Sequence, residues 1–184
     1  MKIERFKFRI TGLTPLMQRC SENAELDQGG IKTAKKLSPL ETATRNVWQD
    51  KQGPFHPAIA FRSAILYAAG GKKIGKRSAR AALAGMIFVG NEKMRLTQAG
   101  NNKPATWVID KRPVVTSQDK MLFDYRPKFE SWGGVLELDV DTDMLPDIQG
   151  VLLPILNEAG TICGVGSFRV ERGGWFGRFS AELC

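Results

Sequence analysis

The 184-residue sequence is poor in the residues that bind metals or form disulfides. It has one histidine, His56, and three cysteines, Cys20, Cys163 and Cys184, which lie far apart. An odd number without a CxxC spacing predicts neither a disulfide framework nor a zinc site, and favours a reducing compartment, the cytoplasm. The GxxxxGK[ST] motif and a GxGxxG opening a helix are also missing, so we expect no cofactor.

Long apolar stretches are missing as well. The longest run, residues 81–89, is about half of what a membrane span requires. The first ten residues alternate charged with apolar side chains, unlike a secretory signal. We therefore expect no membrane partner. With 42% hydrophobic and 25% charged residues, the sequence is typical of a globular protein, and we expect one domain over residues 1–184.

Positive charge is what the sequence has in excess. Its 27 Lys and Arg residues against 19 Asp and Glu residues give a net charge of +8. A positive potential of this kind attracts polyanions, and nucleic acid is the first partner class that it suggests. Charge alone leaves a merely soluble basic protein as the alternative.

Hydrophobic periodicity predicts an α+β fold. Residues 5–10 form a half-buried strand whose outer face is basic, with Arg5, Lys7 and Arg9 on it. Capping residues predict a helix over 39–49 and a second one from Pro57. Strands are expected at 86–89 and 135–140, with a β-hairpin insertion at about 90–130. A helix after Asp143 contains Pro154, which indicates a kink or a later start.

Two segments are candidates for binding phosphates. The first is a cationic run within nine residues, which suits a flexible arm and has a solvated charged loop as its alternative: Lys72, Lys73, Lys76, Arg77 and Arg80. The second is the C-terminal region, where six glycines fall between 160 and 177. Its candidate residues are Gly164, Gly166, Arg169, Arg172, Gly173, Gly174, Trp175, Phe176, Gly177 and Arg178.

The C-terminal region predicts an anion-binding nest. Glycines let successive N–H groups turn toward an anion, and arginine side chains add forks suited to phosphate. Trp175 and Phe176 would offer faces on which unstacked bases lie. The alternative is a glycine-rich hairpin with both rings in the core.

Catalytic and metal-binding hypotheses have less support. His56 could act as a general base for metal-independent RNA cleavage, but the sequence offers no partner for it, and a polar residue near a helix cap is the alternative. Acidic residues alternate from Glu137 to Asp143, where a solvated strand face competes with a divalent-ion site.

Three segments, taken in order, resemble the RAMP superfamily, the repeat-associated proteins of CRISPR effector complexes. Residues 10–16 (ITGLTPL) resemble the end of that family's first strand, and residues 56–65 (HPAIAFRSAI) its first main helix. Residues 164–178 are similar to its glycine-rich loop. Each motif is degenerate alone, and residues 90–128 remain unassigned. Small phage-encoded proteins of this general kind are similar as well.

The resemblance implies a ferredoxin-like or RRM-like antiparallel sheet with helices on one face, and it adds Arg62 to the binding residues. Subunits of that family stack along a strand, which implies a homo-oligomer or filament. It also implies a CRISPR-type or phage replication or recombination protein as partner.

We therefore predict a non-catalytic protein that binds single-stranded RNA or DNA through the phosphate backbone. The alternatives are an endoribonuclease using His56, and a protein-interaction subunit or phage inhibitor that mimics a CRISPR subunit.

Overall fold

The computed structural model describes residues 1–20, 37–115 and 121–184. Its main sheet is antiparallel and has the strand order β12-β1-β11-β7. Helix α3 (Ala58–Ala68) follows β1, and helix α5 (Leu153–Ile162) follows β11. The path β1-α3-β7-β11-α5-β12 is the βαββαβ arrangement of ferredoxin-like folds, which confirms the predicted α+β class. The strands are β1 (Ile3–Gly12), β7 (Ile87–Val89), β11 (Gly133–Asp141) and β12 (Phe179–Leu183).

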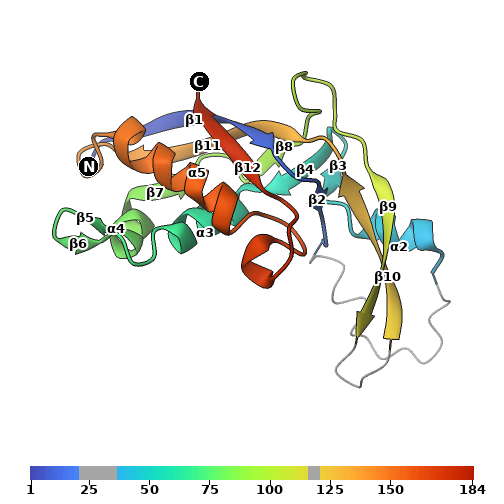
Figure 1. Ribbon diagram of the computed structural model, residues 1–184. Helices are drawn as coiled ribbons and strands as arrows, with labels where there is room; N and C mark the ends of the chain where they lie inside the picture. Colours follow the sequence, from blue (N-terminus) through green and yellow to red (C-terminus); the bar gives the residue numbers. More distant parts are fainter. Residues whose placement is uncertain (21–36, 116–120) are drawn as a thin grey trace, which may run out of the picture.

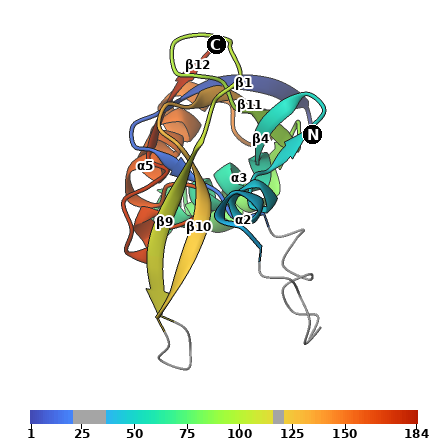
Figure 2. The ribbon, with the colours of Figure 1, turned by 90° about the vertical axis from the view of Figure 1, so that its right-hand side faces the viewer.

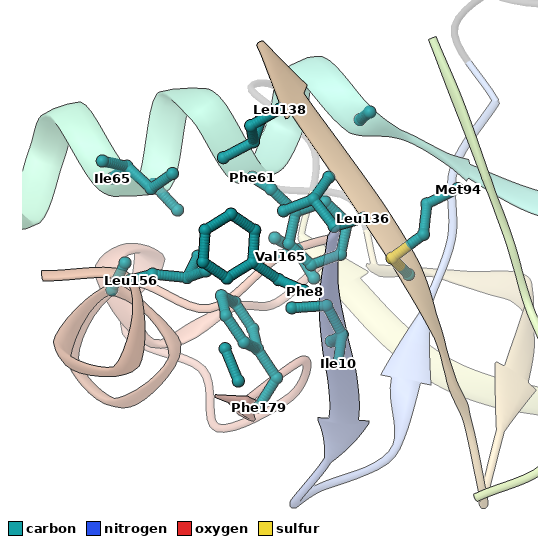
Figure 3. Close-up of a cluster of buried hydrophobic side chains, with 14 of the residues drawn as sticks. Phe8, Ile10, Phe61, Ile65, Met94, Leu136, Leu138, Leu156, Val165 and Phe179 are labelled. Atoms are coloured by element: carbon teal, nitrogen blue, oxygen red, sulfur yellow. The ribbon is translucent and has the colours of Figure 1, made fainter. Parts of the chain in front are cut away.

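Both helices lie on one face of this sheet, below it in the view of Figure 1. Side chains alternate along β1. Phe8 and Ile10 are buried under the helices, while Arg5, Lys7 and Arg9 are exposed on the other face. Phe61 of α3 meets Phe179 of β12 edge-on, with ring centroids 5.2 Å apart. Figure 3 shows these rings in the core that joins the sheet to both helices.

A long β-hairpin projects away from the main sheet, as Figures 1 and 2 show. It consists of β9 (Val108–Val115) and β10 (Met121–Phe129), which pair antiparallel inside the region where an insertion is predicted. Strand β2 (Leu16–Met17) extends the hairpin at its base. A second small sheet holds β3 (Gln49–Asp50), β4 (Gly53–Pro57) and β8 (Lys93–Arg95).

Helix α2 (Pro39–Arg45) begins as predicted and ends early. Its capping box is complete: the Glu41 N–H donates to the Ser38 hydroxyl at 3.2 Å, and the Ser38 N–H donates to the Glu41 carboxylate at 2.8 Å. The predicted extension to residue 49 is wrong because Gln49 and Asp50 pair as strand β3 with β4.

The cationic run at 72–80 is folded, which corrects the prediction of a flexible arm. Strands β5 (Lys73–Ile74) and β6 (Arg77–Ser78) form a small hairpin, and helix α4 (Ala79–Met86) follows directly. Met86 is therefore the last residue of α4, and strand β7 begins at Ile87. The predicted strand at 86–89 began one residue too early.

Helix α5 starts later than a helix capped by Asp143 would. A π-helical segment, Ile148–Leu152, precedes it, and the Asp147 carboxylate accepts a hydrogen bond from the Gly150 N–H at 2.7 Å. Pro154 then falls in the first turn of α5, where its missing N–H costs nothing. Of the helices that the structure describes, none is long and apolar enough to cross a membrane.

Two helical glycines should respond to alanine with opposite signs. A Cβ on Gly160 of α5 would lie 1.9 Å from the carbonyl oxygen of Phe179, whereas a Cβ on Gly85 of α4 meets no atom within 4 Å. We expect Gly160→Ala to destabilise the fold by about 1–3 kcal/mol through overpacking. Gly85→Ala should stabilise it by about 0.5–1 kcal/mol, because alanine is the better helix former. Urea unfolding of both variants checks this, and stabilisation by Gly160→Ala would contradict the close approach.

Candidate nucleic-acid interface

The glycine-rich loop, residues 163–178, connects α5 to β12 and lies between α3 and the β9–β10 hairpin, in red-orange in Figure 1. Close backbone contacts explain its glycines. A Cβ on Gly177 would lie 1.8 Å from the carbonyl oxygen of Val165, and one on Gly174 would lie 1.7 Å from that of Phe168. Gly177 also has a φ of +69°, which side chains other than hydrogen rarely allow.

The structure corrects the predicted anion nest. The N–H of Gly164 donates to the carbonyl of Ala159, and the N–H of Gly177 donates to that of Pro15. The N–H groups of Gly173 and Gly174 are likewise taken by carbonyls within the loop. Carbonyls of the chain itself satisfy these four donors, so Gly164, Gly173, Gly174 and Gly177 shape the loop instead of presenting their N–H groups to an anion.

A groove of about 310 Å³ runs between this loop and helix α3. The structure brings together in it four predicted binding residues: Gly164, Gly166, Arg80 and Arg169. Tyr67 and Ser63, one turn apart on the exposed side of α3, line the same groove and were not singled out by the sequence. Ile59, Ser63 and Tyr67 are spaced four residues apart, so they form an exposed stripe along α3 away from its buried residues. This spacing was the signal in the sequence that could have identified Ser63 and Tyr67.

The two arginines of the groove differ in how they are held. Arg169 contacts the Glu171 carboxylate through Nε at 2.8 Å and through a terminal nitrogen at 2.7 Å. Its other nitrogen donates to the carbonyl of Gly166 at 3.3 Å, which fixes the guanidinium at the groove wall. Arg80 is exposed and forms no ion pair with the residues that the structure describes. Arg80 therefore brings an uncompensated charge, and Arg169 an oriented one.

The two aromatic residues of the loop, Trp175 and Phe176, differ in exposure. Trp175 is 54% exposed, whereas Phe176 is buried. The two rings lie 4.4 Å apart, and the guanidinium of Arg112, from the hairpin, lies 4.5 Å from the Phe176 ring centroid. The prediction that Phe176 stacks on a base is wrong because the residue is only 1% exposed and its ring is contacted within the protein. Trp175 keeps an exposed surface.

The hairpin meets the loop through cation–π contacts that the sequence did not reveal. Arg126 of β10 lies 4.5 Å from the ring centroid of Phe168, and Asp124 pairs with the same arginine. Phe168 has a φ of +52°, an unusual conformation for a residue with a side chain. No local pattern links residue 126 to residue 168, since only the folded chain brings the two segments together.

Other predicted binding residues serve the fold. Arg62 donates to the carbonyls of Ala84 and Ile87 at 2.7 and 3.0 Å, and so caps the end of α4. Arg178 donates to the carbonyl of Thr161 at the end of α5. Arg62 and Arg178 therefore satisfy carbonyls at the C-terminal ends of helices, which corrects their predicted role as nucleic-acid-binding residues. Lys72 pairs with Glu158 at 2.9 Å, and exposed Arg172 contacts Glu171 at 3.6 Å.

The basic residues of β1 point to the opposite face of the sheet. Arg5 binds both carboxylate oxygens of Asp139, at 2.7 and 3.0 Å, and Lys7 contacts Glu137 at 3.3 Å. Asp139 and Glu137 of β11 therefore compensate Arg5 and Lys7 of β1. Arg9 lies on the same outer face, away from the groove. The divalent-ion hypothesis for Glu137 and Asp139 is weakened by the same ion pairs, and the described residues hold no group of three metal ligands.

His56 is buried outside the groove. Its Nδ1 lies 3.3 Å from the side-chain nitrogen of Gln18, which also donates to the carbonyl of Phe55 at 2.8 Å. Burial, together with the positive charge of Arg169, lowers the pKa of His56 to about 4. Only 4% of the residue is exposed.

Comparisons with known proteins support the fold alone. No protein-family profile matches the chain, and no curated protein matches it. Twenty-seven chains of solved structures are similar. One belongs to the cryo-EM structure of the type III-B Cmr-beta bound to cognate target RNA, with a TM-score of 0.53 and 12% identity. The likeness covers 99% of this chain and 61% of that one, so this chain spans less than two thirds of its length.

The burial of His56 predicts a pH dependence of stability. The pKa of His56 rises from about 4 in the folded chain to 6.5 when unfolded, so the unfolded state binds the proton first as the pH falls. We expect the free energy of unfolding to fall between pH 6.5 and pH 4, by as much as about 3 kcal/mol. Urea titrations across this range measure it. His56→Gln should flatten the curve, and an unchanged slope in that variant would assign the loss to other groups.

Proposed function

We propose that this chain binds single-stranded RNA in the groove between α3 and the glycine-rich loop, and does not cleave it. The observation that carries the proposal is the convergence of Arg80, Arg169 and Tyr67 on one groove from α4, the loop and α3. Guanidinium groups suit phosphate oxygens, and an exposed phenol ring suits a base or ribose. Trp175, on the same loop, adds a further exposed ring.

The distribution of charge favours the helical side of the molecule as the side that binds RNA. On the outer face of the sheet, Arg5 and Lys7 are compensated by carboxylates. On the helical side, the small β5–β6 hairpin leads directly into Arg80, and its exposed cations form no ion pair with the residues in the described ranges: Lys73, Lys76 and Arg77. A strand leaving the groove past Arg80 would meet this cationic hairpin next.

The groove lining also favours binding over catalysis. Burial raises the pKa of the Cys163 thiol, so the thiol stays protonated near neutral pH. The Glu171 carboxylate is engaged by Arg169 and Arg172. Neither group is free to act as a nucleophile or a base, and His56 lies outside the groove.

The choice of RNA and of family belongs to this proposal. The similar fold of a chain from a complex bound to target RNA supports RNA over DNA. The same likeness, together with the motifs at 10–16, 56–65 and 164–178, supports membership of the RAMP superfamily. A phage origin and a filament along the strand stay predictions from the sequence.

The role of the groove in RNA binding is tested by removing one positive charge from the groove or, in a second variant, from the outer face of the sheet. Arg80→Ala should weaken binding of a labelled single-stranded RNA about tenfold and reduce the salt slope by about 0.7, the amount for one lost phosphate contact. Arg5→Ala removes the same charge from the opposite face, and affinity should change less than about twofold. Filter binding over a range of salt concentrations measures both. Equal losses in the two variants would mean that total charge, and not the groove, determines binding.

A second candidate function is assembly with another copy of the chain, and the tip of the β9–β10 hairpin favours it. Four apolar side chains there are more than half exposed, with exposed fractions from 54% to 69%: Val115, Met121, Leu122 and Phe123. Val115, Met121 and Phe123 lie on one face of the hairpin, and an exposed apolar patch of this kind marks interaction sites. The hairpin projects from the body, so the ends of β9 and β10 that carry these side chains lie away from the main sheet (Figure 1).

Assembly is tested by making the tip polar. The double variant Leu122→Ser/Phe123→Ser should sediment as a monomer at concentrations where the unchanged chain forms larger species. Val135→Ser, at an apolar residue 46% exposed on the outer sheet face, should leave sedimentation unchanged. A monomeric unchanged chain, with and without RNA, would remove the assembly function.

A further inference from the structure

A pocket of about 550 Å³ lies on the face of the sheet that the helices leave open. Strands β1 and β11 form its floor, β8 one wall, and the loop of residues 97–104 its cover. In Figure 1 this loop, between β8 and β9, rises from the sheet on the side away from α3 and α5. Thr97 and Gly133 exchange backbone hydrogen bonds of 3.0 and 2.8 Å, which anchor the loop to β11.

Where β8 crosses β11, the pocket is lined by bare backbone at Gly133 and Gly134 for a structural reason. A Cβ on Gly134 would lie 2.3 Å from the carbonyl oxygen of Arg95, and one on Gly133 would lie 2.7 Å from that of Ile10. Glycine lets β8 cross close to the sheet at this point. The hollow beside the crossing is therefore built into the backbone.

Positive charge gathers at this pocket. Arg9 is exposed and forms no ion pair within the described part of the chain, although Glu182 is its neighbour in register on β12. Lys93 and Arg95 share the single carboxylate of Asp50, with contacts of 2.9 and 2.6 Å. One carboxylate between two cations leaves an excess of positive charge.

The one acidic residue in the lining does not cancel that excess. The carboxylate of Glu137 is contacted by Lys7 at 3.3 Å and by Arg5 at 3.7 Å. Hydrogen bonds from Arg95 and Lys93 hold the pKa of Asp50 well below its usual range, so this carboxylate stays ionised and in place. The cations of the wall are thus fixed in position while Arg9 remains available.

Two uncharged donors line the same pocket as Arg9. The Thr11 hydroxyl and the Asn102 side-chain amide line the pocket, and neither makes a hydrogen bond to another described residue. A guanidinium fork, a hydroxyl and an amide suit the oxygens of one phosphate group. No aromatic side chain lines the pocket within the described residues, which argues against base stacking as the source of affinity.

We propose that this pocket binds a small phosphorylated ligand of nucleotide size, held through its phosphate by Arg9, Thr11 and Asn102. Its volume lies within the range of about 300–1,000 Å³ typical of small-molecule sites. The site is on the opposite face of the sheet from the RNA groove, so it does not depend on the function proposed for that groove.

The test uses the full chain and adenosine monophosphate, with inorganic phosphate as a second probe, in calorimetric titrations at constant ionic strength. We expect saturable binding with one ligand per chain. Arg9→Ala should weaken it at least about tenfold, since it removes a charge-assisted contact. Lys76→Ala removes an equal charge from the exposed β5–β6 hairpin on the helical side, outside the pocket lining, and should weaken it less than about threefold. Asn102→Ala, on the exposed loop, is a second pocket variant whose folding should be unaffected.

Three results would overturn the proposal. One is the lack of saturable binding by either probe, and another is an equal loss in Arg9→Ala and Lys76→Ala. The third concerns the source of the phosphate: if single-stranded RNA displaces the nucleotide and Arg9→Ala weakens RNA to the same extent, the pocket belongs to a nucleic-acid strand. Nucleotide binding that persists in the presence of saturating RNA supports a separate site.

Discussion

The candidate groove depends on backbone segments that approach more closely than side chains allow. Gly160 of α5 packs directly on the carbonyl of Phe179, and Gly177 packs on that of Val165. These contacts hold the glycine-rich loop against β12, where it faces α3 across the groove. The hydrogen bond from the Gly177 N–H to Pro15 ties the same loop to the segment after β1. The groove is therefore a product of the packing of the main chain, and the functional side chains are added to a preformed shape.

Carboxylates compensate the basic residues at some places on the surface and not at others. On β1 and β11, basic and acidic residues stand opposite each other in register, so Arg5 and Asp139 neutralise one another. The net charge of +8 is consequently not spread evenly over the surface. It remains at positions without a carboxylate neighbour, such as Arg80 and the β5–β6 hairpin on one side and Arg9 on the other. Uneven compensation of this kind concentrates the attraction for anions at a few places.

Features that depend on local sequence were predictable, and features that depend on distant contacts were not. Alternation along β1 and the capping box at Ser38 are set by neighbouring residues, and both are confirmed. The fold class followed from the order of such elements. The burial of Phe176 could not be predicted, because Arg112, from a hairpin more than sixty residues earlier, covers its ring. Arg62 was misassigned for the same reason, since the carbonyls that it binds belong to α4 and to the first residue of β7.

The rigidity of the loop bears on how it would bind a flexible strand. Phe168 keeps a left-handed backbone while the Ser167 N–H donates to Met17 and the Phe176 N–H donates to Phe168 itself. Arg126 of the hairpin contacts the Phe168 ring at the same time. With hydrogen bonds on both sides and a cation on its ring, this segment is ordered before any ligand arrives. The loop backbone then needs no ordering on binding, which leaves more of the contact energy of Arg169 and Trp175 available for affinity.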